Sequence, residues 1–144
     1  MQNQETQQLK NEIVGTGAAV VASQNRVREI MTATQRKLAE NGNIVMEGRD
    51  IGTKVFPDAD KKFYFHADPE ERGRRRFLEL KSKYTGVDLQ HIIKQIKQRD
   101  YEDTHRAIAP LMQADDAIYV DTTRMTIEEL VELVVGYIHP PAGV

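Results

Sequence analysis

The chain has 144 residues, which suggests one domain with a modest core, and its hydrophobic (40%) and charged (29%) fractions are ordinary for a globular protein. Its net charge of −2 argues against broad non-specific binding to nucleic acid. The absence of cysteine excludes disulfides, thiolate zinc sites and a cysteine nucleophile, and no apolar run approaches the roughly 20 residues of a membrane span.

The sequence pattern in the first half of the chain predicts one helix and two strands. Its first eight residues are polar and rich in glutamine, typical of neither a signal peptide nor a transit peptide, so we expect a cytoplasmic protein. A helix is predicted over 25–40, ended by Asn41-Gly42. Its apolar face comprises Val27, Ile30, Met31, Thr34 and Leu38. A short buried strand should follow at Ile44 to Glu47, and an aromatic-rich strand at Lys62 to Ala67.

The second half predicts three helices and one strand. Asp68 should cap a helix that has Pro69 in its first turn and runs to about Lys83, and Asp88 should cap the next helix. A strand is predicted over 117–121, and a capping box over 126–129 opens a last helix. The residues of that helix expected to face inward are Leu130, Val131, Val134 and Ile138. The alternation of helices and strands predicts an α/β fold with a mostly parallel sheet.

The connection between the first two predicted strands is short. Only residues 49–61 join them, and Pro57-Asp58 breaks any helix there. A parallel crossover needs a dozen or more residues, usually helical. The two strands are therefore either an antiparallel pair, or parallel strands that are not neighbours and admit another strand between them.

Two charged groups are candidates for a ligand site. Arg49 and Asp50 follow the predicted strand at the point where open α/β sheets bind ligands, and they offer a fork for phosphate and an acceptor for a base amine. Arg99, Asp103 and Arg106 are spaced to share one helical face. The plain alternatives are an ordinary surface ion pair for the first group and a solvated salt-bridge ladder for the second.

A third group is the basic cluster after Pro69. It comprises Arg72, Arg74, Arg75 and Arg76. The alternatives are a solvated helix balanced by neighbouring glutamates, a nucleic-acid patch, or an arginine lid over a polyphosphate, in which guanidinium groups stabilise the transferring charge. The four histidines lack the spacing of metal ligands, so no metal site is predicted. Neither Gly48 to Lys54 nor Gly15 to Gly17 fits a phosphate-binding glycine loop.

Several ordered motifs follow one another along the chain. The first is Gly48-Arg49-Asp50-Ile51-Gly52-Thr53, followed by Val55-Phe56-Pro57-Asp58-Ala59. The others are Pro69-Glu70-Glu71-Arg72 with Arg75-Arg76, Ile96-Lys97-Gln98-Arg99-Asp100 with Asp103, Arg106-Ala107-Ile108-Ala109-Pro110-Leu111, and the strand region 116–123. Together these motifs resemble the cytidylate kinase family, over about residues 11–137. The resemblance implies transfer of the γ-phosphoryl group of ATP to CMP or dCMP with Mg²⁺, on a P-loop kinase-like parallel sheet with flanking helices.

The resemblance implies a role for each candidate residue. Arg49 and Arg106 would grip the CMP phosphate, and Arg28 and Asp50 would read the cytosine edge. Arg99 and Asp103 would hold the sugar. The catalytic arginines would be Arg106 together with the lid residues Arg72, Arg75 and Arg76. The small molecules bound would be CMP or dCMP and ATP, with no nucleic-acid or membrane partner.

The chain also departs from the family pattern. It has no Walker A loop, so we expect residues 1–24 to be a remnant of the nucleotide-monophosphate-binding insertion, 25–139 the C-terminal part of the kinase domain with a lid around 68–86, and 140–144 a tail. Ala19 falls where the family has a base-contacting serine. We expect negligible kinase activity from this chain alone, and self-association or pairing with a separate N-terminal segment. The alternatives are a non-catalytic CMP-binding fragment, or a kinase of UMP or AMP.

Overall fold

The computed structural model describes residues 12–139 of the chain. The predicted tail at 140–144 and the first eleven residues of the predicted segment 1–24 lie outside this described range. The chain divides into two compact units, Met1–Glu47 and Gly48–Val144. Among the described residues, no helix has both the length and the apolar character needed to cross a bilayer.

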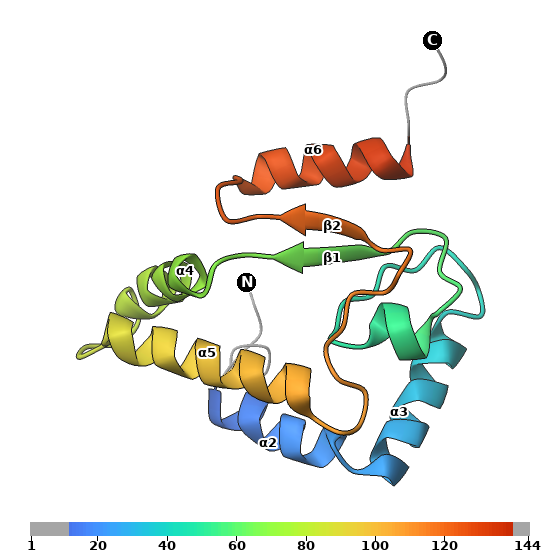
Figure 1. The fold of residues 1–144 in the computed structure, drawn as a ribbon, viewed down its shortest axis with the longest axis horizontal. Coiled ribbons are helices and arrows are strands. Elements are labelled where there is room, and N and C mark those ends of the chain that lie inside the picture. The colour runs from blue at the N-terminus through green and yellow to red at the C-terminus, as the bar shows by residue number, and fades with distance from the viewer. Residues whose placement is uncertain (1–11, 140–144) are drawn as a thin grey trace. The chain divides into compact units, whose positions relative to one another are not determined.

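Over residues 12–47, the described part of the first unit contains two helices, α2 (Glu12–Ala22) and α3 (Asn25–Leu38), shown in Figure 1. The predicted helix over 25–40 is confirmed, and it ends before Gly42, whose φ of +70° is easily adopted only by residues such as glycine. The predicted apolar face of α3 is not buried, since Ile30, Met31 and Leu38 are at least half exposed. The physical reason is that α2 is the one described element packed against α3, and a pair of short helices covers little surface.

The second unit contains a two-stranded parallel sheet, β1 (Phe63–His66) with β2 (Ile118–Asp121). Phe63 pairs with Ile118 and His66 with Asp121, and backbone hydrogen bonds extend the ladder by one residue at each end. These strands confirm the predictions over 62–67 and 117–121. With the helices of the same unit they make a mixed α/β fold, as predicted (Figure 1).

The strand predicted at Ile44 to Glu47 is wrong, so neither of the two alternatives for its relation to Lys62 to Ala67, an antiparallel pair or parallel strands that are not neighbours, applies. The structure has no strand over 43–48, and Val45 is 97% exposed. A short apolar run becomes a strand only when a neighbouring strand takes its backbone hydrogen bonds. Within residues 12–139 the only strand pair is β1 with β2, so this run has no such neighbour.

Helices α4 (Pro69–Lys81) and α5 (Leu89–His105) pack against each other. Ile92 and Ile93 of α5 are buried, and Gly73 of α4 lies so close that an added Cβ would stand 2.4 Å from Cγ1 of Ile93. The predicted Asp88 cap is confirmed, because its carboxylate accepts from the N–H of His91 at 2.7 Å. Asp68 occupies the N-cap position of α4, but its side chain makes no capping hydrogen bond.

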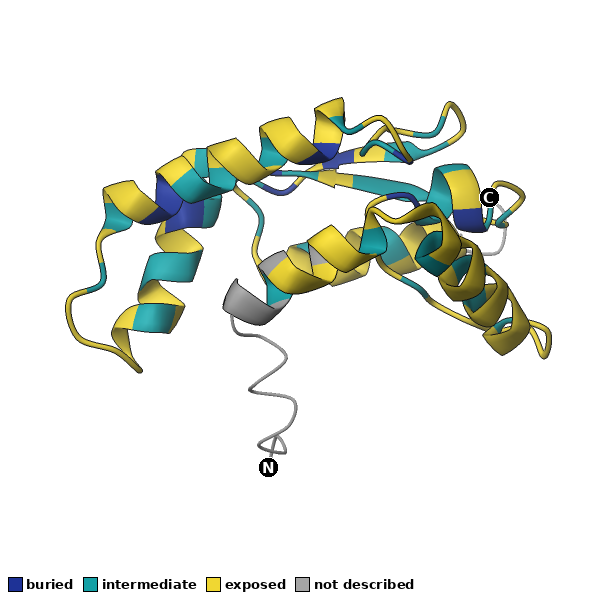
Figure 2. Ribbon diagram, turned by 90° about the horizontal axis from the view of Figure 1, so that it is seen from below, coloured by how far each residue is buried: buried dark blue, intermediate teal, exposed yellow. Residues whose placement is uncertain are grey.

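Helix α6 (Ile127–Ile138) begins at the predicted capping box and packs on the sheet. Thr126 and Glu129 exchange both capping hydrogen bonds. The centroid of the Tyr137 ring lies 6.0 Å from the centroid of the Phe63 ring. The prediction that Val131 and Ile138 point inward is wrong, since they are 53% and 43% exposed. The apolar surface of α6 is wider than two strands can cover. Figure 2 shows buried residues in only a few short segments of the ribbon.

Candidate functional site

The turn after Gly48 is a single π-helical element, η1 (Ile51–Val55). The carbonyl of Asp50 accepts from the N–H of Lys54 at 2.8 Å and of Val55 at 3.3 Å. Any Cβ at Gly48 would stand 2.7 Å from Cγ1 of Ile51, so glycine permits the tight approach. Asp50 is buried at 9% exposure. Isolated π-turns are uncommon and occur often at functional sites.

Three arginines surround the carboxylate of Asp103, a group that we name the Asp103 cluster. The Nε atom of Arg49 lies 3.1 Å from Oδ2 of Asp103, and that of Arg99 lies 3.9 Å from the same oxygen. Nη1 of Arg106 lies 3.6 Å from Oδ1. Arg49 comes from the turn before η1, whereas Arg99, Asp103 and Arg106 belong to α5 and its C-cap. The structure therefore brings together four of the residues that the sequence singled out.

The electrostatics of the Asp103 cluster favour an anion. Three guanidinium groups face one carboxylate, which leaves an excess of two positive charges. Asp103 is buried at 8% exposure, and the buried atoms Asp103 Oδ2 and Arg106 Nη2 have no hydrogen-bond partner within residues 12–139. Guanidinium forks match the oxygens of phosphate in shape and charge. The cluster can therefore accept a dianionic phosphate.

The two residues predicted to read a base lie in different units. Asp50 lies in the second unit and directly follows Arg49, a member of the Asp103 cluster, in the sequence. Arg28 lies on α3 in the first unit, where its Nη1 donates to the carbonyl of Ala22 at 3.3 Å. The placement of Arg28 relative to the cluster stays a prediction.

Arg72, predicted as a lid residue, is held by three hydrogen bonds. Its Nε donates to the carbonyl of Ala67 at 2.9 Å, and its two Nη groups form a fork with the carboxylate of Asp100, one of them at 2.9 Å. The hydrogen bonds to Asp100 raise the pKa of Arg72 above its ordinary value. The fork joins the first turn of α4 to α5, and the hydrogen bond to Ala67 joins it to the residue that follows β1.

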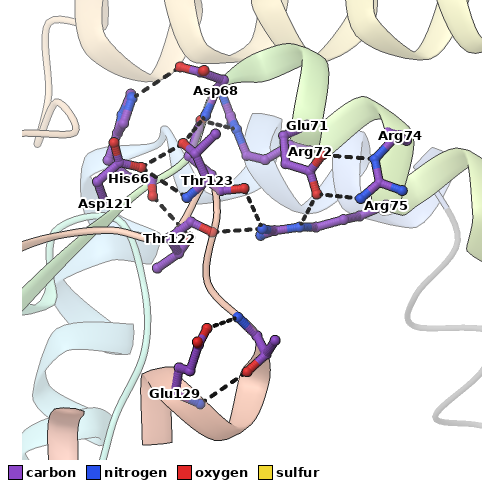
Figure 3. A network of polar contacts seen from close by, with 12 residues as sticks. His66, Asp68, Glu71, Arg72, Arg74, Arg75, Asp121, Thr122, Thr123 and Glu129 are labelled. Carbon is purple, nitrogen blue, oxygen red and sulfur yellow. Dashed lines mark hydrogen bonds and ion pairs between the residues drawn. The ribbon is translucent and has the colours of Figure 1, made fainter.

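The other predicted lid arginines pair with carboxylates of α4 itself. Arg75 pairs with Glu71 at 2.9 Å and donates to the carbonyl of Thr122 at 2.7 Å, so it bridges α4 and the end of β2 (Figure 3). Arg76 pairs with Glu79 at 2.7 Å. The structure thus does not gather Arg72, Arg75 and Arg76 around one point, and a polyphosphate would have to compete with these carboxylates.

The hydrogen bonds of Glu71 with Arg74 and Arg75 predict an acid sensitivity for α4. The hydrogen bonds from Arg74, and then those from Arg75, lower the pKa of Glu71 to about 2 from the ordinary 4.5. Because the unfolded chain binds the proton more tightly, this contribution to stability is complete above about pH 4.5 and is lost as the pH falls toward 2. We expect the wild-type free energy of unfolding to fall more steeply than that of Glu71→Gln between pH 5 and 2, as denaturant titrations would show. Parallel curves would contradict the pairing.

Two features of the site were not assigned a role from the sequence. Asp100 ends the motif Ile96-Lys97-Gln98-Arg99-Asp100, but nothing in the sequence pattern relates it to Arg72, 28 positions earlier. The signal available in the sequence was that Arg72 and Asp100 carry opposite charges on two consecutive predicted helices, which could therefore form an ion pair. The carbonyl of Ala109 accepts from Nε of Arg106 at 2.6 Å. No side-chain pattern could have indicated a backbone contact of this kind.

The comparison with known proteins gives a single family. The sequence profile described as "Cytidylate kinase" matches residues 1–140. A cytidylate kinase of Geobacter sp. (strain M21) is 44% identical over 128 residues, which cover 89% of this chain and 55% of that protein. Those of Pseudomonas paraeruginosa (strain DSM 24068 / PA7) and Pseudomonas syringae pv. tomato (strain ATCC BAA-871 / DC3000) are 45% identical over 132 and 133 residues, covering 92% of this chain and 58% of each relative. The chain thus spans little more than half the length of these relatives, and it belongs to the cytidylate kinase family.

Proposed function

We propose that this chain provides the acceptor site of a kinase that transfers the γ-phosphoryl group of ATP to CMP or dCMP. The observation that carries the proposal is the Asp103 cluster, in which three arginines converge on one buried carboxylate. Phosphoryl transfer depends on holding the acceptor in line and on neutralising charge, and it needs little covalent chemistry from the protein. An arginine-rich anion site performs both tasks.

Each residue of the cluster has a proposed role. Arg49 and Arg106 grip the acceptor phosphate, and their approach to Asp103 from two separate elements supports a clamp. Arg99 and Asp103 hold the sugar, since a carboxylate accepts hydrogen bonds from hydroxyl groups. Asp50 reads the cytosine edge by accepting from the base amine, and Arg28 reads it by donating to the acceptor atoms of the base. We expect Arg106 to act on the reacting phosphate as well.

The donor side of the reaction rests on the lid helix. We infer that residues 68–86 form the lid, and that Arg72, Arg75 and Arg76 exchange their carboxylate partners for the phosphates of ATP. The guanidinium chemistry fits phosphate oxygens. The family resemblance also implies Mg²⁺, which proteins commonly hold through one or two side chains together with substrate phosphates and waters. No step of this proposal is assigned to Mg²⁺. We place the reaction in the cytoplasm.

Calorimetric titration of the purified chain with CMP, dCMP, UMP and AMP tests the acceptor site. We expect CMP and dCMP to bind about ten-fold more tightly than the other two, and Asp50→Asn to remove most of this preference. Arg49→Ala should weaken CMP binding about 30-fold through loss of a charge-assisted phosphate contact. Arg49 is 44% exposed, so its removal should leave the fold intact.

The matched control is Arg74→Ala, which removes an equal charge from an exposed arginine outside the Asp103 cluster. This variant should bind CMP like the wild type. Equal affinity for all four nucleotides would contradict the cytosine assignment and would favour a UMP or AMP kinase. The absence of any nucleotide binding by the folded chain would contradict the proposal as a whole.

A further inference from the structure

Ala109 has a backbone conformation that alanine rarely adopts. Its φ is +47°, in the left-handed region, and its side chain is buried at 8% exposure. The Cβ of an L-residue disfavours this region, and a following proline restricts the backbone further, which applies here because Pro110 comes next. Such conformations persist where the surrounding structure fixes them, and they gather at functional sites.

The conformation of Ala109 accompanies two contacts with the end of α5. The carbonyl of Ala109 accepts from Nε of Arg106 at 2.6 Å. Two residues later, the N–H of Leu111 donates to the backbone carbonyl of Asp103 at 2.7 Å. The segment after α5 therefore folds back on the helix end and contacts the backbone or side chain of two members of the Asp103 cluster.

The contact with Ala109 limits what Arg106 can do. A guanidinium group is planar, so a hydrogen bond at Nε together with the position of one Nη group fixes the plane of the whole fork. Nη1 faces Asp103 at 3.6 Å, and the buried Nη2 has no hydrogen-bond partner within residues 12–139. With Nε satisfied by a carbonyl, the two Nη groups are left for the carboxylate and for a ligand.

We propose that Ala109 is a positioning residue, whose left-handed backbone holds its carbonyl against Nε of Arg106 and so turns the Nη edge of that arginine toward the acceptor phosphate. The inference rests on the proposed function, because it takes Arg106 as a phosphate ligand. It goes further by assigning the orientation of Arg106 to a backbone group outside the charged cluster. The side chain of Ala109 itself contributes only its conformational preference.

Substitutions at position 109 separate the backbone conformation from the side chain. Ala109→Gly adopts positive φ freely and should bind CMP within two-fold of the wild type. Ala109→Val disfavours positive φ because it is β-branched, and it should bind CMP about ten-fold more weakly. The matched control is Asn43→Val, which puts the same side chain at another positive φ, +52°, outside the site. It should lose stability but keep its affinity for CMP.

A spectroscopic readout tests the inference without relying on nucleotide binding. In the wild type and in Ala109→Gly, the Nε–H proton of Arg106 should exchange with water at least ten-fold more slowly than that of Arg26, whose side chain is 82% exposed and pairs with Glu29 through Nη1, as measured by NMR. Ala109→Val should lose this protection. An unprotected Arg106 in the wild type, or a Val variant with wild-type protection and CMP affinity, would overturn the inference. Failure of the wild type to bind CMP would instead count against the proposed function.

Discussion

Replacement of Asp103 by asparagine should lower the free energy of unfolding by about 2 kcal/mol. The change keeps the shape of the side chain and removes the one negative charge among the arginines of the Asp103 cluster. Breaking a buried ion pair by removing one partner typically costs roughly 3–5 kcal/mol. The expected cost is smaller because Arg49 and Arg99 are 44% and 57% exposed and can turn toward water. Urea unfolding of the two proteins at pH 7 measures the difference.

The same variant distinguishes an anion site from an ordinary ion-pair network. Added inorganic phosphate, at constant ionic strength, should stabilise Asp103→Asn more than the wild type, because the arginines then lack their internal counter-ion. The control is Glu29→Gln, which removes a carboxylate from an exposed pair with Arg26 and should change stability by less than about 0.5 kcal/mol. If phosphate stabilised Asp103→Asn and the wild type equally, the arginines would be a structural network and not a binding site.

Local signals in the sequence predicted the ends of helices well. The capping box at Thr126 and Glu129 and the cap at Asp88 depend on residues three positions apart, so the sequence alone contains the whole interaction. The strands around Phe63 and Ile118 were also predictable, because runs of aromatic and β-branched residues favour strands. The parallel class followed from the alternation of helices and strands.

Interactions between distant segments were not predictable in the same way. The apolar run at Ile44 to Glu47 has the composition of a strand, but strand formation depends on a neighbour that composition does not reveal. Val131 of α6 belongs to a helical apolar stripe, yet burial depends on what lies opposite. The Arg72–Asp100 fork and the carbonyl of Ala109 depend on the path of the backbone. The arginines of the site could be named in advance, whereas the groups that orient them required the structure.

Replacement of Gly73 in α4 should destabilise the fold strongly. An alanine there would place Cβ 2.4 Å from Cγ1 of Ile93, an atom near the start of its side chain that cannot easily move aside. Alanine stabilises a helix interior by about 1 kcal/mol relative to glycine, but the loss of stability from overpacking at this contact should exceed that gain. We expect Gly73→Ala to lower the free energy of unfolding by about 2 kcal/mol, and Gly73→Val to lower it further. Thermal and urea unfolding provide the measurement.

A second glycine and a second-site change give the controls for this prediction. Gly136 lies inside α6, where an added Cβ would meet nothing within 4 Å, so Gly136→Ala should raise stability by about 0.5–1 kcal/mol. Ile93→Ala removes the atom that collides, and the double variant with Gly73→Ala should be more stable than the sum of the single changes predicts. Additive losses would mean that α4 does not approach α5 this closely. The Arg72–Asp100 fork depends on the same approach, so it would then be lost as well.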